Sequence, residues 1–101
     1  MDVHQLHARL DDNSYCLVDV RNQNEWDEGR IPGATHIMLG TVPERLNELL
    51  EGKLFIVQCH SGARSAIAAS LLQANGFKNV LNVKGGYLAW TKAKLPVIKK
   101  S

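Results

Sequence analysis

Cys59 opens the segment with the clearest chemical potential in this sequence of 101 residues. An apolar run, 54–57, precedes it, and an Ala-rich segment, 65–75, follows the short polar stretch that it begins. This order predicts a strand, a tight loop and a helix. The backbone N–H groups of such a loop can converge on one point, where the positive end of the helix also stabilises negative charge. A thiol placed there ionises readily and becomes a nucleophile.

We therefore expect Cys59 to be a catalytic nucleophile, and the residues after it to bind the group that it carries. Gly62 supplies the backbone freedom that a tight loop requires, and Arg64 supplies a permanent, planar positive charge suited to an oxyanion. The expected binding residues are His60, Ser61, Gly62, Ala63, Arg64 and Ser65. The alternative is a buried structural cysteine, since cysteine often packs as a small apolar side chain.

The spacing between the thiol and the cation indicates which chemistry the loop suits. Four residues separate Cys59 from Arg64, whereas phosphatases that form a cysteinyl-phosphate have five between the corresponding residues. A tighter ring is too small for a tetrahedral phosphate or arsenate but accommodates one extra sulfur atom. The spacing therefore favours a persulfide, and a phosphatase-like or arsenate-reducing enzyme is the disfavoured alternative.

The remaining segments predict the elements that must position this loop. Helical patterns cover 3–10, 65–75 and 87–92, and Thr41 with Pro43 marks the start of a further helix that ends at Gly52. Short apolar runs at 15–20, 36–39, 54–57 and 80–83 predict strands. Strands that alternate with helices form a parallel sheet covered on both sides, an α/β fold whose sites lie at the carboxyl ends of the strands. We expect one domain, 1–101.

Three groups of residues, spread over nearly the whole chain, resemble the motifs of the rhodanese family. The first group lies before the loop, the second is the loop itself, and the third lies near the end of the sequence. They are LVDVR at 17–21 with EW at 25–26 and GRIPGA at 29–34, CHSGAR at 59–64, and VKGGY at 83–87 with Trp90.

The resemblance implies a three-layer fold with a parallel five-stranded sheet flanked by helices on both faces. It also implies that Cys59 carries a persulfide, as in a thiosulfate sulfurtransferase, with no cofactor. Donors in the family include thiosulfate, persulfides and thiosulfonates, and acceptors include cyanide, small thiols and protein cysteines. The alternative within this fold is a binding or regulatory module without turnover, which has no need of an intact Cys59, Gly62 and Arg64.

Two features depart from the family pattern or extend it. Arg30 stands where His is usual, and we expect it to affect local packing or a surface contact, and not catalysis. The segments 37–40 and 43–46 look like those of rhodanese units joined to metallo-β-lactamase-fold persulfide dioxygenases, which predicts a unit from a larger fusion.

Other polar residues have structural interpretations. We expect Asp19, Arg21 and Glu25 to form a network that fixes the loop running to Gly29, and Cys16 to be an inert core residue with a raised pKa. Lys84 precedes the glycine pair and, on the family's geometry, attracts anions. His4 and His7 lack a third ligand with suitable spacing, so we predict no metal site.

Charge and hydropathy narrow the class of partner. The net charge is +2 with both signs mixed along the chain, so we predict no nucleic-acid binding. No apolar run is long enough to span a membrane, and no basic segment followed by an apolar one begins the sequence. Cys16 and Cys59 lie in different settings, which argues against a disulfide between them. Together with the missing export signal, this predicts reduced thiols in a cytoplasmic protein.

Overall fold

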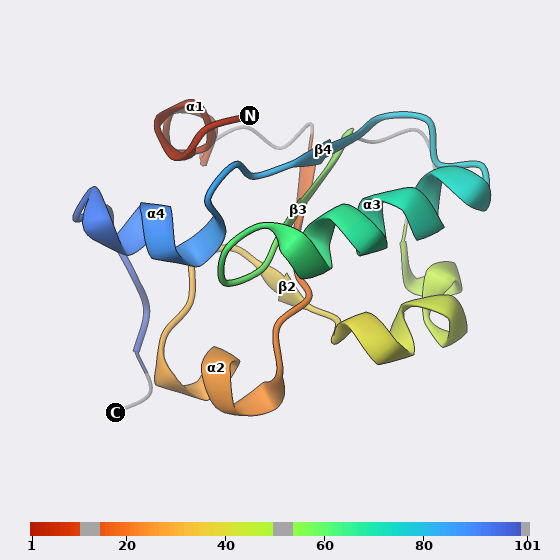
Figure 1. The fold of residues 1–101 in the computed structure, drawn as a ribbon, viewed down its shortest axis with the longest axis horizontal. Helices are drawn as coiled ribbons and strands as arrows, with labels where there is room; N and C mark the ends of the chain where they lie inside the picture. The colour runs from red at the N-terminus through yellow and green to blue at the C-terminus, as the bar shows by residue number, and fades with distance from the viewer. Residues whose placement is uncertain (11–14, 50–53, 100–101) are drawn as a thin grey trace.

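A parallel sheet organises the computed structural model, which describes residues 1–10, 15–49 and 54–99. The strands follow the order β2-β1-β3-β4 (Figure 1). The elements along the chain are α1 (Val3–Ala8), β1 (Tyr15–Asp19), α2 (Gln23–Glu28), β2 (Thr35–His36), the 3₁₀ segments η1 (Leu39–Glu44) and η2 (Leu46–Glu48), β3 (Leu54–Gln58), α3 (Ala63–Ala74), β4 (Val80–Asn82) and α4 (Gly86–Lys92).

The predicted α/β class is correct, but the predicted strand number is not: the sheet has four strands within the described ranges, where five were expected. Met1 lies beside β4, where its amino group donates to the Asn82 carbonyl and its carbonyl accepts from the Lys84 N–H. Asp2 already caps α1 by accepting from the Gln5 N–H. Met1 is therefore the one described residue that pairs along this edge, and a single residue does not form a strand.

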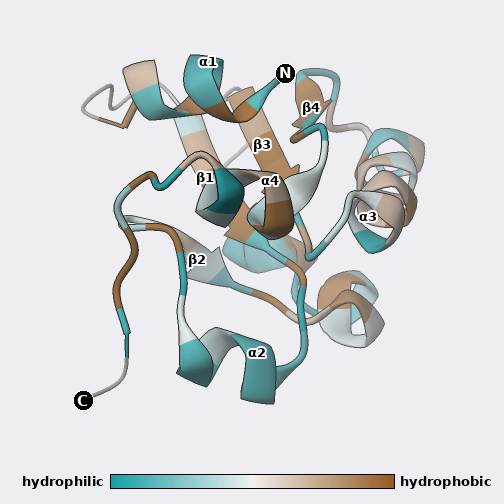
Figure 2. Ribbon diagram, turned by 60° about the vertical axis from the view of Figure 1, so that its left-hand side comes forward, coloured by the Kyte–Doolittle hydropathy of each residue, from teal (hydrophilic) through white to brown (hydrophobic). Residues whose placement is uncertain are grey.

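Side-chain alternation along β3 divides the core into two halves. Phe55, Val57 and Cys59 pack on the side of α3, with Ala68 and Leu72 from that helix. The opposite side carries Ile56 together with residues of α1 and α4, namely Val3, Leu6 and Trp90. Figure 2 shows apolar segments of the strands between these helices. The sheet is therefore covered on both faces, as a continuous apolar strand requires.

The helix predicted from Thr41 to Gly52 is wrong in type. The described part, up to Leu49, forms two 3₁₀ segments whose bonds run between residues three apart, such as Arg45 N–H to the Val42 carbonyl. The Thr41 hydroxyl donates to the Met38 carbonyl and does not accept as a cap. Pro43 has no N–H to continue a longer ladder. Gly52 and the predicted helix break at 11–13 lie outside the described residues.

The order of the strands determines where the loop lies, because β2 and β4 are added on opposite sides of the central pair β1 and β3. The strands β1 and β3 are neighbours, with Asp19 opposite Gln58, but β2 lies on the outer side of β1 and β4 on the outer side of β3. The loops that leave β1 and β3 therefore diverge, and a crevice forms between them at the carboxyl ends of the strands. Both the segment after Asp19 and the segment that begins at Cys59 lie at this crevice.

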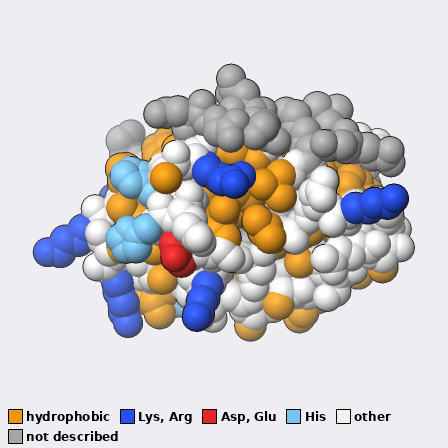
Figure 3. Space-filling view, turned by 90° about the horizontal axis from the view of Figure 1, so that it is seen from above, with side chains coloured by type: hydrophobic (Ala, Val, Ile, Leu, Met, Phe, Trp, Pro, Cys, Tyr) orange, Lys and Arg blue, Asp and Glu red, His pale blue; other side chains and the backbone are white. Residues whose placement is uncertain are grey.

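Figure 3 shows the face over α1 and β4, whose charge distribution can be compared with the prediction that the protein does not bind nucleic acid. Its Lys and Arg side chains are spread apart, with apolar side chains between them. A hollow of about 490 Å³ on it is lined by Met1, Gln5, Ala8, Arg9 and Leu81. None of the helices in the described ranges has the length and apolar character needed to cross a bilayer.

A buried ion pair fixes the segment that leaves β1. Arg21 is 2% exposed and Asp19 is fully buried, and the Arg21 Nη2 lies 2.8 Å from Asp19 Oδ2. The same Nη2 donates to the Gly29 carbonyl at 2.6 Å, and the guanidinium lies 4.1 Å from the centre of the Tyr87 ring. Arg21 thereby joins β1, the end of α2 and α4, as the predicted network required.

Replacing Asp19 by Ala will reduce the free energy of unfolding by about 3–5 kcal/mol, because it leaves the Arg21 charge buried without a counter-ion. Urea unfolding followed by circular dichroism measures the loss. Asp27→Ala is the control, since Asp27 lies in α2 and bonds only to the exposed Gln23 amide in the described contacts. A loss for Asp19→Ala no larger than that of the control would contradict the role given to the pair.

Candidate active site

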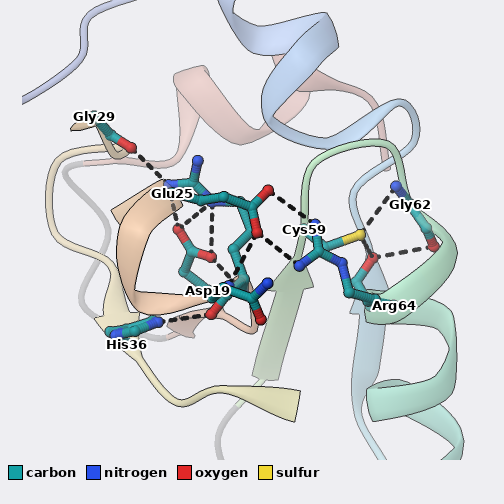
Figure 4. A network of polar contacts seen from close by, with 10 residues as sticks. Asp19, Glu25, Gly29, His36, Cys59, Gly62 and Arg64 are labelled. Carbon is teal, nitrogen blue, oxygen red and sulfur yellow. Dashed lines mark hydrogen bonds and ion pairs between the residues drawn. The ribbon is translucent and has the colours of Figure 1, made fainter. Parts of the chain in front are cut away.

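The segment from Cys59 to Gly62 connects the end of β3 to the start of α3 in a tight curl (Figure 4). Gly62 caps α3 with φ of 108°, a left-handed conformation that glycine adopts without steric cost. Cys59 is 1% exposed, so its thiol lies at the bottom of the curl. The predicted order of strand, loop and helix is confirmed, with the first residue of the helix at Ala63.

Several hydrogen-bond donors surround the sulfur atom of Cys59. The Gly62 N–H lies 3.1 Å from Sγ and the Ser65 hydroxyl 3.4 Å from it. Burial raises the pKa of Cys59, but bonds from the Ser65 hydroxyl and from the backbone N–H groups of Ser65, Gly62 and Ser61 outweigh it, and the net pKa is lowered. The loop therefore stabilises a thiolate, as the sequence predicted.

The glycine pair at the start of α4 allows a close contact that holds the loop carbonyls outward, so that the loop N–H groups turn inward. The carbonyls of Cys59 and His60 point away from the sulfur and accept from the N–H groups of Tyr87, at 2.7 Å, and Leu88, at 2.9 Å. A Cβ on Gly86 would overlap the Cys59 carbonyl oxygen and lie 2.8 Å from the His60 oxygen. Only glycine at this position lets the start of α4 approach closely enough to hold both carbonyls.

Arg64 lies beside the loop and is held by Glu25 of α2. Arg64 Nη1 donates to Glu25 Oε1 at 2.7 Å and Nη2 donates to Oε2 at 2.9 Å, a two-pronged pair that bridges the crevice (Figure 4). The bond from Arg64 lowers the pKa of Glu25 to about 2, and the bond from the Asn22 N–H also lowers it. Glu25 therefore belongs to the predicted network, but its partner is Arg64 across the crevice.

The predicted site residues differ in their exposure to solvent. Cys59 and Ser65 are buried, and Gly62 and Arg64 are half-buried. The side chains of His60, Ser61 and Ala63 are exposed and leave the mouth of the loop open. Of the predicted binding residues, those that place a donor on Sγ are Ser61, Gly62 and Ser65.

Asn82, at the end of β4, belongs to the site although no sequence pattern selects it. Its side-chain Nδ2 donates to the Gly62 carbonyl at 3.2 Å, and its Oδ1 accepts from the Ser65 hydroxyl. In the sequence Asn82 is one polar residue within the apolar run 80–83, and no spacing connects it to Cys59. The parallel pairing of β4 with β3 brings it to the loop.

A cavity of about 430 Å³ adjoins the loop at His60. It extends between α2 and α4, and both acidic and basic side chains line it, including those of Glu25, Glu28 and Lys99. A small charged molecule can therefore approach the mouth of the loop from this side. Lys84, which was expected to attract anions, is exposed and is not among the residues that line this cavity.

The residues around Arg30 form a stacked group outside the loop. The Arg30 guanidinium lies 4.7 Å from the centre of the Trp26 ring, and Trp26 stacks on His36 with ring centres 4.7 Å apart. The Arg30 backbone also pairs with Ile98. Arg30 therefore contributes to local packing, as predicted for this departure from the family pattern.

The second thiol has a different setting. Cys16 lies in β1, is half-buried and packs against the core on the side of α3. Cys16 was predicted to be an inert core residue; it is half-buried, and its place in a strand against the core fits that structural role.

Two relatives at the sequence level support the assignment of a family. The chain is 35% identical over 99 residues to a sulfurtransferase of Allochromatium vinosum, an alignment that covers 97% of this chain and 92% of the relative. It is 45% identical over 80 residues to the putative sulfur carrier protein YrkF of Bacillus subtilis, which covers 79% of this chain. The chain spans only 43% of the length of that second relative.

A solved structure and a family model agree with these relatives. The crystal structure of a rhodanese-related protein from Thermoplasma volcanium superposes with a TM-score of 0.89 at 28% identity, covering 97% of this chain and 95% of the other. Neither relative nor this structure is named as a metallo-β-lactamase fusion, so the predicted fusion gains no support. The model of the rhodanese-like domain matches residues 2–93. The chain therefore belongs to the rhodanese-like domain family.

Proposed function

We propose that this protein is a sulfurtransferase in which Cys59 carries one sulfur atom as a persulfide between a donor and an acceptor. The observation that carries the proposal is the group of donors around a buried thiol, because these donors stabilise a negatively charged sulfur. The names of the relatives, a sulfurtransferase and a putative sulfur carrier protein, support the same class of reaction. No cofactor enters the proposed chemistry.

The first half-reaction loads the sulfur. The Cys59 thiolate attacks the outer sulfur of a donor such as thiosulfate and forms a new S–S bond. The S–S bond of thiosulfate breaks, and sulfite leaves with its electron pair. The terminal sulfur of the Cys59 persulfide now carries the negative charge, which the loop N–H groups stabilise in place of the original thiolate. No proton or electron is consumed, since one thiolate-like anion replaces another.

The second half-reaction returns the enzyme to its resting state. A nucleophile, either cyanide or a thiolate, attacks the terminal sulfur and forms a bond to it. The S–S bond of the persulfide breaks, and Cys59 leaves as the thiolate that began the cycle. Acceptors of this kind include small thiols and cysteines of other proteins. The exposed His60 and Ser61 leave the mouth of the loop open to them.

The tight ring argues for sulfur over phosphorus. The interval between Cys59 and Arg64 is one residue shorter than that of the cysteinyl-phosphate enzymes. The Arg64 guanidinium is engaged by both oxygens of Glu25, whereas a phosphate-binding loop needs its arginine fork for the phosphate oxygens. The other alternative, a binding module without turnover, gives no reason for the lowered pKa of Cys59.

Incubation with thiosulfate will add one sulfur atom to the protein, and cyanide will remove it and release thiocyanate. Intact-mass spectrometry and a thiocyanate assay measure the two steps. The Cys59→Ser variant will gain nothing, whereas Cys16→Ser will load normally, because Cys16 lies opposite Phe55 in the sheet, four residues before the loop begins. If no sulfur is added by thiosulfate, a glutathione persulfide or a thiosulfonate, the proposed function is wrong and a binding module becomes the better explanation.

The Glu25→Gln variant will bind thiosulfate more tightly, because it frees Arg64 for the sulfonate group of the donor. We expect the KM for thiosulfate to fall about three- to tenfold, since a charge-assisted bond to arginine becomes available. Initial rates of thiocyanate formation measure it. With a pKa of about 2, Glu25 stays ionised between pH 5 and 8. Its titration therefore contributes nothing to the pH dependence of the wild-type rate in that range.

Glu28→Gln is the matched control for this variant. Glu28 lies on the same helix and lines the same cavity, but the structure gives it no bond to Arg64. Its replacement removes one negative charge near the mouth and leaves the Arg64 pair intact. An equal fall in KM for both variants would mean that general charge, and not the release of Arg64, governs donor binding.

A further inference from the structure

The side chain of Asn82 lies between two groups of the loop and has a fixed orientation. Its Nδ2 donates to the Gly62 carbonyl, which can only accept, so the amide cannot be turned over without placing two oxygens together. The Oδ1 atom therefore faces the Ser65 hydroxyl and accepts from it. Because Oδ1 carries no hydrogen, the hydrogen between these two oxygens must come from Ser65.

The Ser65 hydroxyl has one hydrogen and several acceptors within reach. Its oxygen lies 3.4 Å from Cys59 Sγ and 3.2 Å from the Gly62 carbonyl, besides its contact with Asn82. A hydroxyl donates one hydrogen bond at a time. Ser65 is fully buried, so water does not supply a further partner. The Cys59 sulfur, the Asn82 amide oxygen and the Gly62 carbonyl therefore compete for the same hydrogen. The Gly62 carbonyl already accepts from the Ala66 N–H and from the Asn82 amide, so the main competitors are Cys59 and Asn82.

This competition depends on the charge of the sulfur. A neutral thiol is a weak acceptor, so the hydrogen points to the Asn82 amide oxygen. A thiolate accepts a charge-assisted bond, which is stronger than a bond between neutral groups, so the hydrogen turns to Sγ. Ionisation of Cys59 therefore gains the Ser65 bond but loses the Asn82 bond, and the gain is smaller than it would be without Asn82.

We propose that Asn82 is a positioning residue that holds the Ser65 hydroxyl hydrogen away from Cys59 until the sulfur carries a full charge. This rests on the proposed function for its place in the cycle, since in a persulfide the charge moves to the outer sulfur and the inner Sγ becomes a weak acceptor again. The hydrogen then returns to Asn82. Asn82 thus allows the Ser65 bond to follow the charge during loading and release.

Other ionisable groups near the loop remain the same when Asn82 is replaced. They come from three helices, from the end of β1 with the residues that follow it, and from the loop itself. They are Arg64 on α3 with its partner Glu25 on α2, Tyr87 on α4, Asp19 with Arg21, and His60. Comparison among variants at one ionic strength therefore isolates the effect of the amide.

The test is the pH dependence of Cys59 alkylation by iodoacetamide in a Cys16→Ser background, followed by peptide mass spectrometry. In the Asn82→Ala variant Ser65 is free to serve the thiolate, and the midpoint of the profile moves to lower pH. At a pH below the wild-type midpoint the alkylation rate rises about two- to fivefold, as expected for the difference of one hydrogen bond. The Gly62 carbonyl keeps a partner in the Ala66 N–H.

Three further variants make the result specific. Ser65→Ala moves the midpoint to higher pH, and Asn82→Ala with Ser65→Ala behaves as Ser65→Ala alone, because Asn82 acts through that hydroxyl. Asn82→Leu has a side chain of similar shape without an acceptor, so it repeats the shift to lower pH and serves if Asn82→Ala does not fold.

A midpoint at or above the wild-type value in either folded Asn82 variant overturns the proposal, since a residue that merely supported the loop would raise it. A shift to lower pH that persists without the Ser65 hydroxyl also overturns it. Alkylation does not require sulfur transfer. If the wild type takes up no sulfur from thiosulfate, a glutathione persulfide or a thiosulfonate while the alkylation profiles are as expected, the proposed function is wrong and this inference stands.

Discussion

A buried thiolate requires several hydrogen-bond donors around one sulfur atom, because burial alone favours the neutral thiol. In this protein that requirement governs the arrangement of three elements. The curl after β3 directs N–H groups at Sγ, α3 begins at once so that the Ser65 hydroxyl lies 3.4 Å from Sγ, and α4 holds the loop carbonyls away from the sulfur. Gly86 permits the last of these contacts.

Two ion pairs hold the walls of the crevice, and their settings differ. The Asp19–Arg21 pair is buried and joins the end of β1 to Gly29 and Tyr87, so it fixes one wall as a rigid unit. The pair of Glu25 with Arg64 is about one-third exposed, so solvent weakens it. A buried pair thus supports the scaffold, whereas the half-buried pair bridges the crevice beside the loop.

The loop was predictable from the sequence because its signals are local. Cys59, Gly62 and the apolar and Ala-rich segments on either side determine a strand, a curl and a helix without reference to the rest of the chain. The partners of Arg64 and Ser65 were not predictable, because Glu25 and Asn82 reach them only through strand pairing. The 3₁₀ segments differ from the predicted helix for a similar reason: packing of Val42 and Leu49 into the core outweighs a local start signal.

The contacts that hold the Cys59 loop in shape come from residues far apart in the chain, and this links reactivity to folding. Glu25 and Arg64 are separated by 39 positions, and Tyr87 reaches the loop from a later helix. An opened molecule loses these contacts together, and its thiol returns to the ionisation of an ordinary cysteine. It is then both less nucleophilic and open to solvent, where oxidation beyond the sulfenic acid is irreversible. The native fold therefore protects the same atom that it activates.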